Sequence, residues 1–419
     1  MDGVIISHLL YADDVVLLAE KEEDLQKMLH ALYEWCSEWG LVVNTSKSAV
    51  VHFRPPSHAA TKYVFLCGDK PIYQESMYKY LGLLLTEHLD YKVTVKMVAQ
   101  SAHRALGLLI AKVKRLGGVP YQCFVKLYES LVWSTIAYSA SIWGSRSYPD
   151  IEAVHNRACR FYLGLGQHAP IAALRGDTGM IPPLCRQVRE MTRQFVRLKS
   201  MHPTRLNHRI LRWSENQRGV RCRAWCGRLE KLLSDLNVPE NIKNVYNTAF
   251  TEHVAKACMD KYITTWQADI ARIAAKHGPG GNKLRIYRCF KDEFCVEPYV
   301  LKVRSFAARS SMAKFRAGVA PINIELGRFL GIPAMDRMCN LCDDKVEDEL
   351  HVIIDCPMYT GLRKELFTQS QYLLEQFDTL TDIDKMRYLF TNNAICNKTA
   401  KTCRLILETR QRAISILIT

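Results

Sequence analysis

The chain begins with a pattern of apolar runs that predicts a β-hairpin. One run covers residues 4–10 and a second covers residues 15–19, and both are rich in Val, Ile and Leu. Two short apolar runs on either side of a turn are typical of paired, buried strands. The turn between them, residues 11–14, reads Tyr-Ala-Asp-Asp, and Asp suits tight turns. The sequence therefore predicts two buried strands whose joined end exposes two carboxylates.

Beyond the hairpin, the spacing of apolar residues changes between helical and strand periods. Residues 21–39 follow a helical period, and Gly40 supplies a C-terminal stop. Strand patterns return at residues 41–43, 48–53, 63–66 and 78–85. From Tyr91 onward the pattern is helical, with Gly and Pro breaks. The predicted fold class is α+β, a small β-rich part followed by a mostly α-helical region.

The same pattern divides the chain into four expected regions. The clearest linker is the Gly- and Pro-rich stretch near residues 278–282. We expect a β-rich region, a helical region with a basic cluster, a second basic helical region that contains the linker, and a C-terminal region with a Cys–His motif. Their boundaries are 1–90, 91–228, 229–330 and 331–419.

Composition narrows the class of partner. The net charge of +15 favours a polyanion, nucleic acid first and an acidic membrane surface second. The longest uncharged apolar stretch, residues 131–144, is too short to span a membrane. The 15 cysteines mostly stand alone in amphipathic stretches, which is typical of thiols in a reduced compartment. With no leader at Met1, we expect an intracellular protein.

Two basic stretches are candidates for phosphate contact. Between residues 186 and 228 there are twelve Lys or Arg and two acids. Four of these arginines share one helix face, where bound phosphates would relieve their repulsion. The alternative is an ordinary solvated face. The four are Arg186, Arg189, Arg193 and Arg197; the candidates in the second stretch are Lys302, Arg304, Arg309, Lys314 and Arg316.

A Cys–His motif near the C-terminus predicts a metal site. Cys339, Cys342, His351 and Cys356 have the spacing C-x2-C-x8-H-x4-C. Three thiolates and one imidazole suit tetrahedral Zn²⁺, and a C-x2-C pair can chelate from one tight turn. The alternative is four unrelated residues in a Cys-rich chain. We expect the acidic insert at residues 343–349 to be a solvent-facing loop.

The carboxylates at the hairpin turn have two interpretations. Asp13 and Asp14 can simply form a polar turn, or they can bind a divalent cation. Because no His or Cys ligand accompanies them, oxygen-only coordination favours Mg²⁺ over Zn²⁺. The residues alone leave both interpretations open.

Residues 7–19 closely resemble the Tyr-Ala-Asp-Asp hairpin of reverse transcriptases from non-LTR (LINE-type, jockey-like) retrotransposons. Residues 40–47 resemble the segment that closes the polymerase palm, residues 80–82 its primer-grip hairpin, and residues 337–359 the C-terminal CCHC knuckle. The resemblance implies a palm remnant, a helical thumb and a zinc knuckle. It also implies RNA and DNA as partners, the element transcript and its target DNA, and a location in nucleus and cytoplasm.

The resemblance assigns roles to individual residues. Asp13 and Asp14 would be catalytic Mg²⁺ ligands, and Lys47 a general acid for the departing pyrophosphate. Tyr11 and Gly82 would lie against a nucleic-acid strand, where glycine allows close approach.

One departure from the family limits the expected activity. The family's third palm carboxylate and its fingers region lie before the hairpin, but only ten residues precede Tyr11 here. Two-metal catalysis needs enough carboxylates to hold both ions. We therefore expect the C-terminal portion of an RNA-directed DNA polymerase, which binds RNA and DNA but is inactive alone. The alternatives are a non-catalytic nucleic-acid-binding protein derived from such an element, and a true start upstream of Met1.

Overall fold

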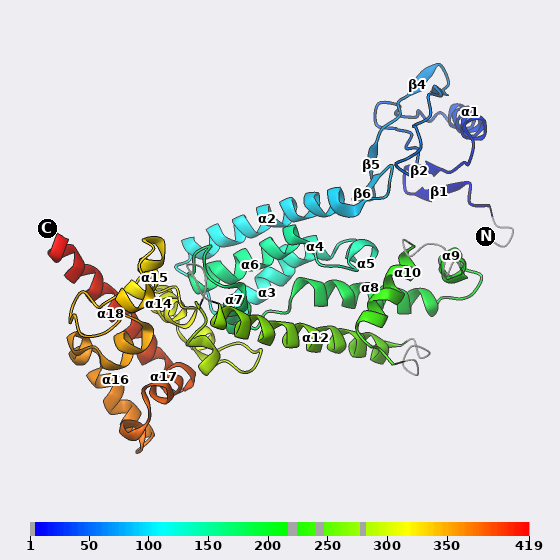
Figure 1. The fold of residues 1–419 in the computed structure, drawn as a ribbon. Helices are drawn as coiled ribbons and strands as arrows, with labels where there is room; N and C mark the ends of the chain where they lie inside the picture. Colours follow the sequence, from blue (N-terminus) through cyan, green and yellow to red (C-terminus); the bar gives the residue numbers. More distant parts are fainter. Residues whose placement is uncertain (1–4, 217–223, 240–246, 277–281, 419) are drawn as a thin grey trace. The chain divides into compact units, whose positions relative to one another are not determined.

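The computed structural model describes residues 5–216, 224–239, 247–276 and 282–418 (Figure 1). These residues fold as two compact units, and each unit is built from two separate chain segments. The first unit comprises Met1–Gln100 and Gln194–Leu232, and the second comprises Ser101–Arg193 and Leu233–Thr419. The predicted linker near 278–282 lies outside the described residues, except for Asn282.

The strands of the described residues form three separate antiparallel hairpins, all in the first unit. Their pairs are β1 (His8–Tyr11) with β2 (Asp14–Leu17), β3 (Phe65–Cys67) with β4 (Lys70–Ile72), and β5 (Met77–Tyr80) with β6 (Leu83–Thr86). The predicted strands at 41–43 and 48–53 are reduced to a single bridge between Val50 and Gln74. With helices making up most of the rest, the α+β class is confirmed at this coarse level.

The segment that resembles the primer grip folds back on itself. Leu81 and Gly82 take φ values of 45° and 82°, so residues 78–85 form a hairpin rather than one continuous strand. A two-residue loop with positive φ at both positions matches the twist of its flanking strands. Glycine adopts this conformation at little cost, whereas Leu81 adopts it at some expense.

Helix α1 (Glu22–Glu38) covers a small core in the first unit. Three acids occupy its first turn, where they favour the positive end of the helix dipole, and Gly40 at φ 64° follows its last turn. Leu29 of this helix packs with Phe65 and Cys67 of β3 and Ile72 of β4. This buried cluster is modest for a segment of this length.

Helices form nearly all of the second unit. Helices α2 (Tyr91–Arg115) and α8 (Pro183–Lys199) each contribute to both units, and the first unit also contains α9 (Leu206–Asn216) and most of α10 (Trp225–Asp235). The remaining α-helices of the described residues are α3 (Tyr121–Leu127), α4 (Ser134–Ala137), α5 (Ala140–Trp143), α6 (Pro149–Leu163), α7 (Ile171–Thr178), α12 (Thr248–Ala275), α13 (Pro298–Lys302), α14 (Phe306–Arg316), α15 (Asn323–Phe329), α16 (Thr360–Leu373), α17 (Asp382–Thr391) and α18 (Cys396–Ile418). Two π-helical segments, η1 (Tyr128–Trp133) and η4 (His351–Asp355), interrupt them.

The long C-terminal helix α18 organises the end of the second unit, where it packs against α13, α14, α16 and α17. At the centre of this unit, Arg316 of α14 is fully buried and pairs with Asp177 of α7 and with Glu297. The phosphate contact predicted for Arg316 is therefore wrong, since its guanidinium is enclosed by protein. No helix among the described residues combines the length and apolar character that crossing a membrane requires.

Candidate functional site

The Tyr-Ala-Asp-Asp sequence forms the tip of the β1–β2 hairpin. Tyr11 pairs with Asp14 across the two strands, so Ala12 and Asp13 make a two-residue loop. Ala12 has a φ of 53°, a left-handed conformation that costs energy for any residue except glycine. Asp13 therefore lies at the tip of the turn and Asp14 begins β2, and both residues are exposed. The turn predicted from the sequence is thus present, and it presents two adjacent acids.

The strands that carry this turn are exposed, so the prediction of two buried strands is wrong. Leu10 is 66% exposed and Tyr11 is 63% exposed, and Leu9 and Val15 are also open to solvent. The apolar pattern that predicted burial is real, but nothing among the described residues covers these side chains. Leu10 and Val15 pair across the two strands and share one face, and an exposed apolar surface of this kind is typical of a site where another protein segment packs.

Asp13 and Asp14 fit one hydrated Mg²⁺ ion better than a pair of ions. Mg²⁺ is commonly held by one or two carboxylates, with water and substrate phosphates completing its octahedron. Two-metal catalysis needs carboxylates that bridge and clamp both ions. Within the described residues, these two acids belong to no cluster of three or more potential metal ligands. The acid pair therefore supplies part of the ligand set that a two-metal centre requires.

The other residues assigned by resemblance to the polymerase site also lie in the first unit. Lys47 is an exposed residue of the turn that follows Asn44, and its backbone carbonyl accepts a hydrogen bond of 2.9 Å from the Tyr78 hydroxyl. Gly82 lies in the loop between β5 and β6, and Tyr78 lies on β5. The Lys47 turn is thus attached to the hairpin that carries Gly82, while the Lys47 ammonium remains open to solvent.

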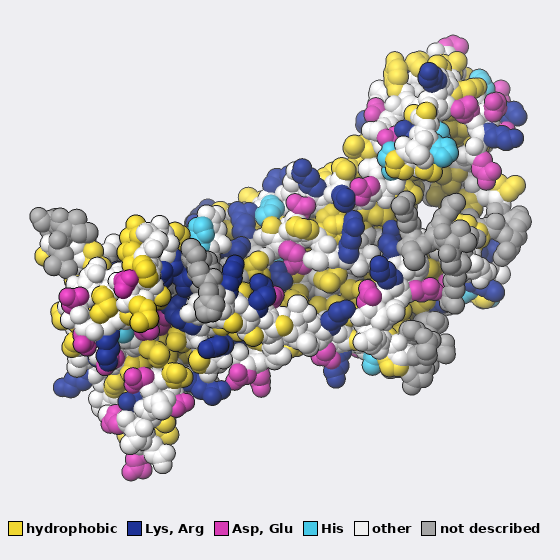
Figure 2. Space-filling view, viewed as in Figure 1, with side chains coloured by type: hydrophobic (Ala, Val, Ile, Leu, Met, Phe, Trp, Pro, Cys, Tyr) yellow, Lys and Arg dark blue, Asp and Glu magenta, His cyan; other side chains and the backbone are white. Residues whose placement is uncertain are grey.

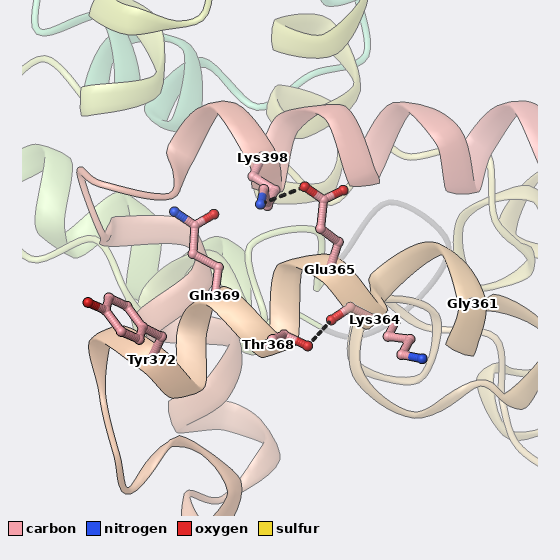
Figure 3. A pocket seen from close by; sticks show the side chains of 7 residues that line it. All are labelled: Gly361, Lys364, Glu365, Thr368, Gln369, Tyr372 and Lys398. Carbon is pink, nitrogen blue, oxygen red and sulfur yellow. Dashed lines mark hydrogen bonds and ion pairs between the residues drawn. The ribbon is translucent and has the colours of Figure 1, made fainter.

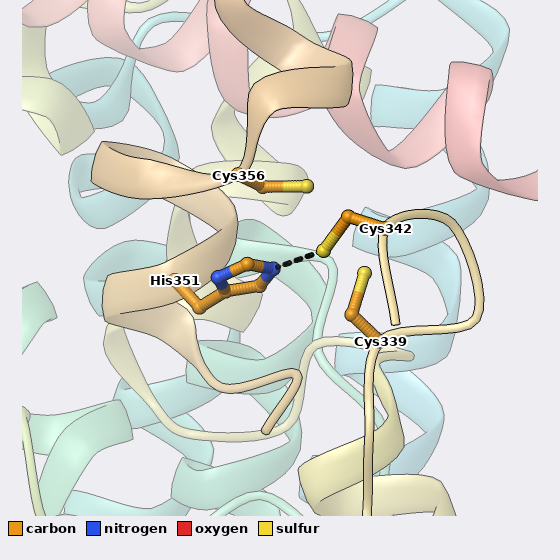
Figure 4. A group of neighbouring side chains, drawn as sticks. All are labelled: Cys339, Cys342, His351 and Cys356. Carbon is orange, nitrogen blue, oxygen red and sulfur yellow. Dashed lines mark hydrogen bonds between the residues drawn. The ribbon is translucent and has the colours of Figure 1, made fainter. Parts of the chain in front are cut away.

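The four predicted zinc ligands come together in the second unit (Figure 4). One ligand atom from each of Cys339, Cys342, His351 and Cys356 lies within 4.8 Å of the others. The Cys342 Sγ and His351 Nε2 atoms are 3.3 Å apart. A tetrahedral zinc ion with Zn–S bonds of about 2.3 Å holds two thiolates about 3.8 Å apart, so a small contraction would complete the site.

The local fold explains how these four side chains converge. A bridge between Met338 and Val346 closes the loop that carries the first two cysteines, and Asp343 turns it with a φ of 52°. Segment η4 carries His351 at its start, and the Cys356 amide donates a 2.7 Å hydrogen bond back to the His351 carbonyl. Burial and the nearby thiols raise the pKa of Cys356 to about 12. A bound cation would reverse this effect, because zinc binds thiolates.

The acidic insert is partly buried, so the prediction of a solvent-facing loop is wrong for two of its glutamates. Glu347 is 0% exposed and forms an ion pair with Arg410 of α18, and Glu349 is buried against Arg285. Asp343 and Asp344 do face solvent. Glu347 attaches the ligand loop to α18, and Glu349 attaches it to the turn that contains Arg285. Sequence reasoning missed them because their partners lie more than 60 residues away in the chain.

A further acid lies beside the histidine ligand. The Asp355 carboxylate is 3.8 Å from His351 Nδ1 and forms an ion pair with Lys345. A carboxylate on the second ring nitrogen of a metal-binding histidine helps to fix its tautomer and orientation. With Nε2 directed at Cys342, the geometry suits zinc coordination through Nε2.

The basic face of α8 is largely engaged with acids from the same unit. Arg186 pairs with Glu129 at 2.8 Å and lies over the Trp133 ring, and Arg189 pairs with Glu252. Arg193 pairs with Glu190 at 3.2 Å, while Arg197 is exposed. Few acids stand near these arginines in the sequence, but Glu129 and Glu252 approach them from other segments of the fold and neutralise part of their charge.

The second basic stretch is divided between surface and interior. Arg304 is exposed, and exposed Lys302 donates a 3.3 Å hydrogen bond to the Asn393 carbonyl. Arg309 is 4% exposed and donates to the carbonyls of Tyr162 and Val303. The phosphate contact predicted for Arg309 is therefore wrong in this structure. Figure 2 shows the Lys and Arg side chains of one face interspersed with Asp and Glu rather than gathered into a single patch.

Comparison with known families and proteins gives consistent matches. Residues 4–85 match the family model described as reverse transcriptase (RNA-dependent DNA polymerase). The RNA-directed DNA polymerase from mobile element jockey of Drosophila melanogaster is 21% identical over 209 residues, 48% of this chain and 22% of that protein. The probable RNA-directed DNA polymerase from transposon BS of the same organism is 28% identical over 163 residues, 36% of this chain and 18% of that protein.

A third relative is a putative uncharacterized transposon-derived protein of Caenorhabditis elegans, 25% identical over 34% of this chain and 50% of its own length. The chain thus matches half or less of the length of each of these relatives. No solved structure matches it. The Tyr-Ala-Asp-Asp hairpin lies inside the matched residues, so this part of the chain is similar to the reverse transcriptases of non-LTR retrotransposons.

Proposed function

We propose that this chain acts as the carboxy-terminal part of an RNA-directed DNA polymerase of a non-LTR retrotransposon. In this role Asp13 and Asp14 supply part of a two-metal nucleotidyl-transfer site, and Lys47 acts as a general acid toward the departing pyrophosphate. The observation that carries the proposal is the position of both acids at the exposed tip of a hairpin within the residues that match the reverse transcriptase family.

In this proposal another polypeptide segment supplies the further carboxylate that a two-metal site requires. Two features support this. The acid pair has no third potential metal ligand clustered with it among the described residues, and the strands beneath it expose Leu10 and Val15 on one face. A segment that packs on these strands would bury the apolar side chains and bring a further carboxylate to the metal ions. Alone, the chain then binds nucleic acid without synthesising DNA.

RNA and DNA binding rests on charge and on the zinc knuckle. The net charge of +15 favours a polyanion, and Arg197, Lys302 and Arg304 remain exposed for phosphate contact. Arg189 and Arg193, whose ion pairs are exposed, can contribute by exchanging an acid partner for a phosphate at a small cost, whereas the largely enclosed Arg186 is held by Glu129. The Cys3His cluster lies in the second unit, as do Lys302 and Arg304.

A non-catalytic nucleic-acid-binding protein derived from such an element is the second candidate. The isolated acid pair favours it, since a protein that only binds nucleic acid needs no metal centre. Primer extension in the presence of the remaining palm and fingers distinguishes the candidates. Synthesis that depends on Asp13 supports the polymerase role, whereas binding without Asp13-dependent synthesis supports the second candidate.

A salt titration tests the nucleic-acid part of the proposal. We expect the affinity of the full chain for an RNA–DNA primer–template to fall steeply between 50 and 200 mM salt, because bound phosphates release counterions. A flat salt dependence contradicts the proposed binding. Arg197→Ala should reduce the slope by about one, as expected for the loss of one phosphate contact.

A further inference from the structure

A groove between α16 and α18 lies on the surface of the second unit (Figure 3), and its first lining residue, Gly361, follows the predicted zinc ligand Cys356 by five positions. Its hollow has a volume of about 610 Å³ and is lined by residues of both helices. Pockets of a few hundred cubic ångströms are large enough to hold a small organic group such as a nucleotide. Gly361 leaves one end open, since nothing lies within 4 Å of where its side chain would be.

Lysines give this groove a positive balance. Lys364 of α16 is exposed, and Lys398 of α18 forms a 2.7 Å ion pair with Glu365 across the groove. Lys398 and the neighbouring Lys401 both lower the pKa of Glu365, so Lys401 faces the same carboxylate. Two ammonium groups thus lie near one carboxylate, while the Lys364 side chain extends away from it (Figure 3). Because the Glu365 side chain is 75% exposed, its pairing with Lys398 is weak and easily exchanged for a phosphate.

An exposed aromatic side chain completes the groove. Tyr372 is 89% exposed near the C-terminal end of α16. It follows Lys364 and Thr368 at intervals of four residues, so these three side chains share one face of the helix. Lys364 and Tyr372 are separated by about 12 Å along the helix axis, at about 1.5 Å per residue. A tyrosine so open to solvent is a stacking surface for a nucleic-acid base.

We propose that the groove between α16 and α18 binds single-stranded nucleic acid, with a base stacked on Tyr372 and phosphates held by Lys364, Lys398 and Lys401. This inference rests on the nucleic-acid binding proposed above and adds a specific site to it. An acidic peptide would satisfy the lysines, but it offers no planar group that would stack on Tyr372. The combination of an aromatic ring and lysines therefore favours a nucleic-acid strand.

Fluorescence anisotropy with the full, zinc-loaded chain and labelled 15-nucleotide poly(U) and poly(dT) tests this site. We expect Tyr372→Ala to weaken binding at least about fivefold, since loss of base stacking costs about 1–3 kcal/mol. Tyr372→Phe keeps the ring and should bind within about twofold of the unchanged chain. Lys364→Ala should reduce the salt slope by about one. Lys126→Ala, which removes an exposed lysine of α3, is the charge-matched control.

The outcomes separate failure of the groove from failure of the proposed function. If the unchanged chain binds neither oligonucleotide, nucleic-acid binding itself is overturned. If it binds both, but Tyr372→Ala and Lys364→Ala behave like Lys126→Ala, only the groove is overturned. A competition experiment gives a second test of the groove. If polyglutamate of equal charge displaces labelled poly(U) as efficiently as unlabelled poly(U) does, the proposed groove is also overturned. Thermal unfolding of each variant verifies folding, which these exposed positions should leave unchanged.

Discussion

Arg410 donates two hydrogen bonds of 2.6 Å to the buried carboxylate of Glu347. Glu347 lies in the loop between the second and third predicted zinc ligands, and Arg410 lies on helix α18. Asn323 at the start of α15 joins them, since its backbone amide donates to Glu347 and its side chain accepts from Arg410. The pair therefore connects the metal-ligand loop with two helices that are distant in the sequence.

We predict that Arg410→Met strongly destabilises the second unit. The substitution keeps much of the side-chain volume but leaves the Glu347 carboxylate buried without its cation, which typically costs about 3–5 kcal/mol. The free energy of unfolding from urea titration measures the effect. Arg404→Met on the same helix removes an exposed pair with Glu408 and should cost less than about 1 kcal/mol. Equal stabilities of the two variants would contradict the structural role of Arg410.

Metal analysis of the purified chain tests the knuckle. We expect about one zinc ion per chain, and Cys339→Ser should release it because one of four ligands is lost. The melting temperature should also fall on treatment with a chelator, since zinc binds the folded state. Cys123→Ser removes an exposed thiol outside the cluster and should keep the zinc content. Full zinc retention by Cys339→Ser would exclude the predicted ligand set.

Stability should depend on pH through His155. This side chain is fully buried, with Nδ1 at 3.3 Å from the Tyr128 hydroxyl, and burial together with Arg175 and Arg186 lowers its pKa well below the usual value. As pH falls below about 6.5, the unfolded chain binds a proton that the folded chain does not. The free energy of unfolding should therefore decrease, by about 1.4 kcal/mol per pH unit below 6.5.

Urea titrations of the unchanged chain and of His155→Gln between pH 7.5 and 5.5 isolate this contribution. The difference in stability between the two should narrow or change sign as pH falls, since glutamine does not titrate. His58→Gln, at an exposed position, is the matched control for the loss of one imidazole. A parallel pH dependence in the unchanged chain and in His155→Gln would contradict the assignment.

Local patterns predicted the features that depend on neighbouring residues. The hairpin turn at Asp13, helix α1 and the convergence of Cys339 with His351 all follow from short-range spacing. Periodicity places such elements because the turn residues and the apolar positions that define them lie within one short segment.

Long-range partners explain what the sequence could not predict. Arg316 looked like a surface cation on a basic helix, but its partner Asp177 lies 139 residues earlier in the chain. Glu347 looked like an exposed loop acid because its partner, Arg410, lies 63 residues later in the chain. Burial of the β1–β2 strands was predicted from their apolar pattern, yet burial also requires a covering element, and the described residues supply none for Leu10. Pairings of this kind are decided by tertiary structure.

The central claim is that Asp13 and Asp14 form part of a polymerase site that another segment completes. Primer extension on an RNA template, with Mg²⁺, deoxynucleotides and this chain alone, tests it most directly, with Asp13→Ala as the control. Both proteins should bind the primer–template, and neither should extend it, because two adjacent carboxylates do not hold two metal ions. Template-dependent DNA synthesis by the unchanged chain that disappears in Asp13→Ala would contradict the claim.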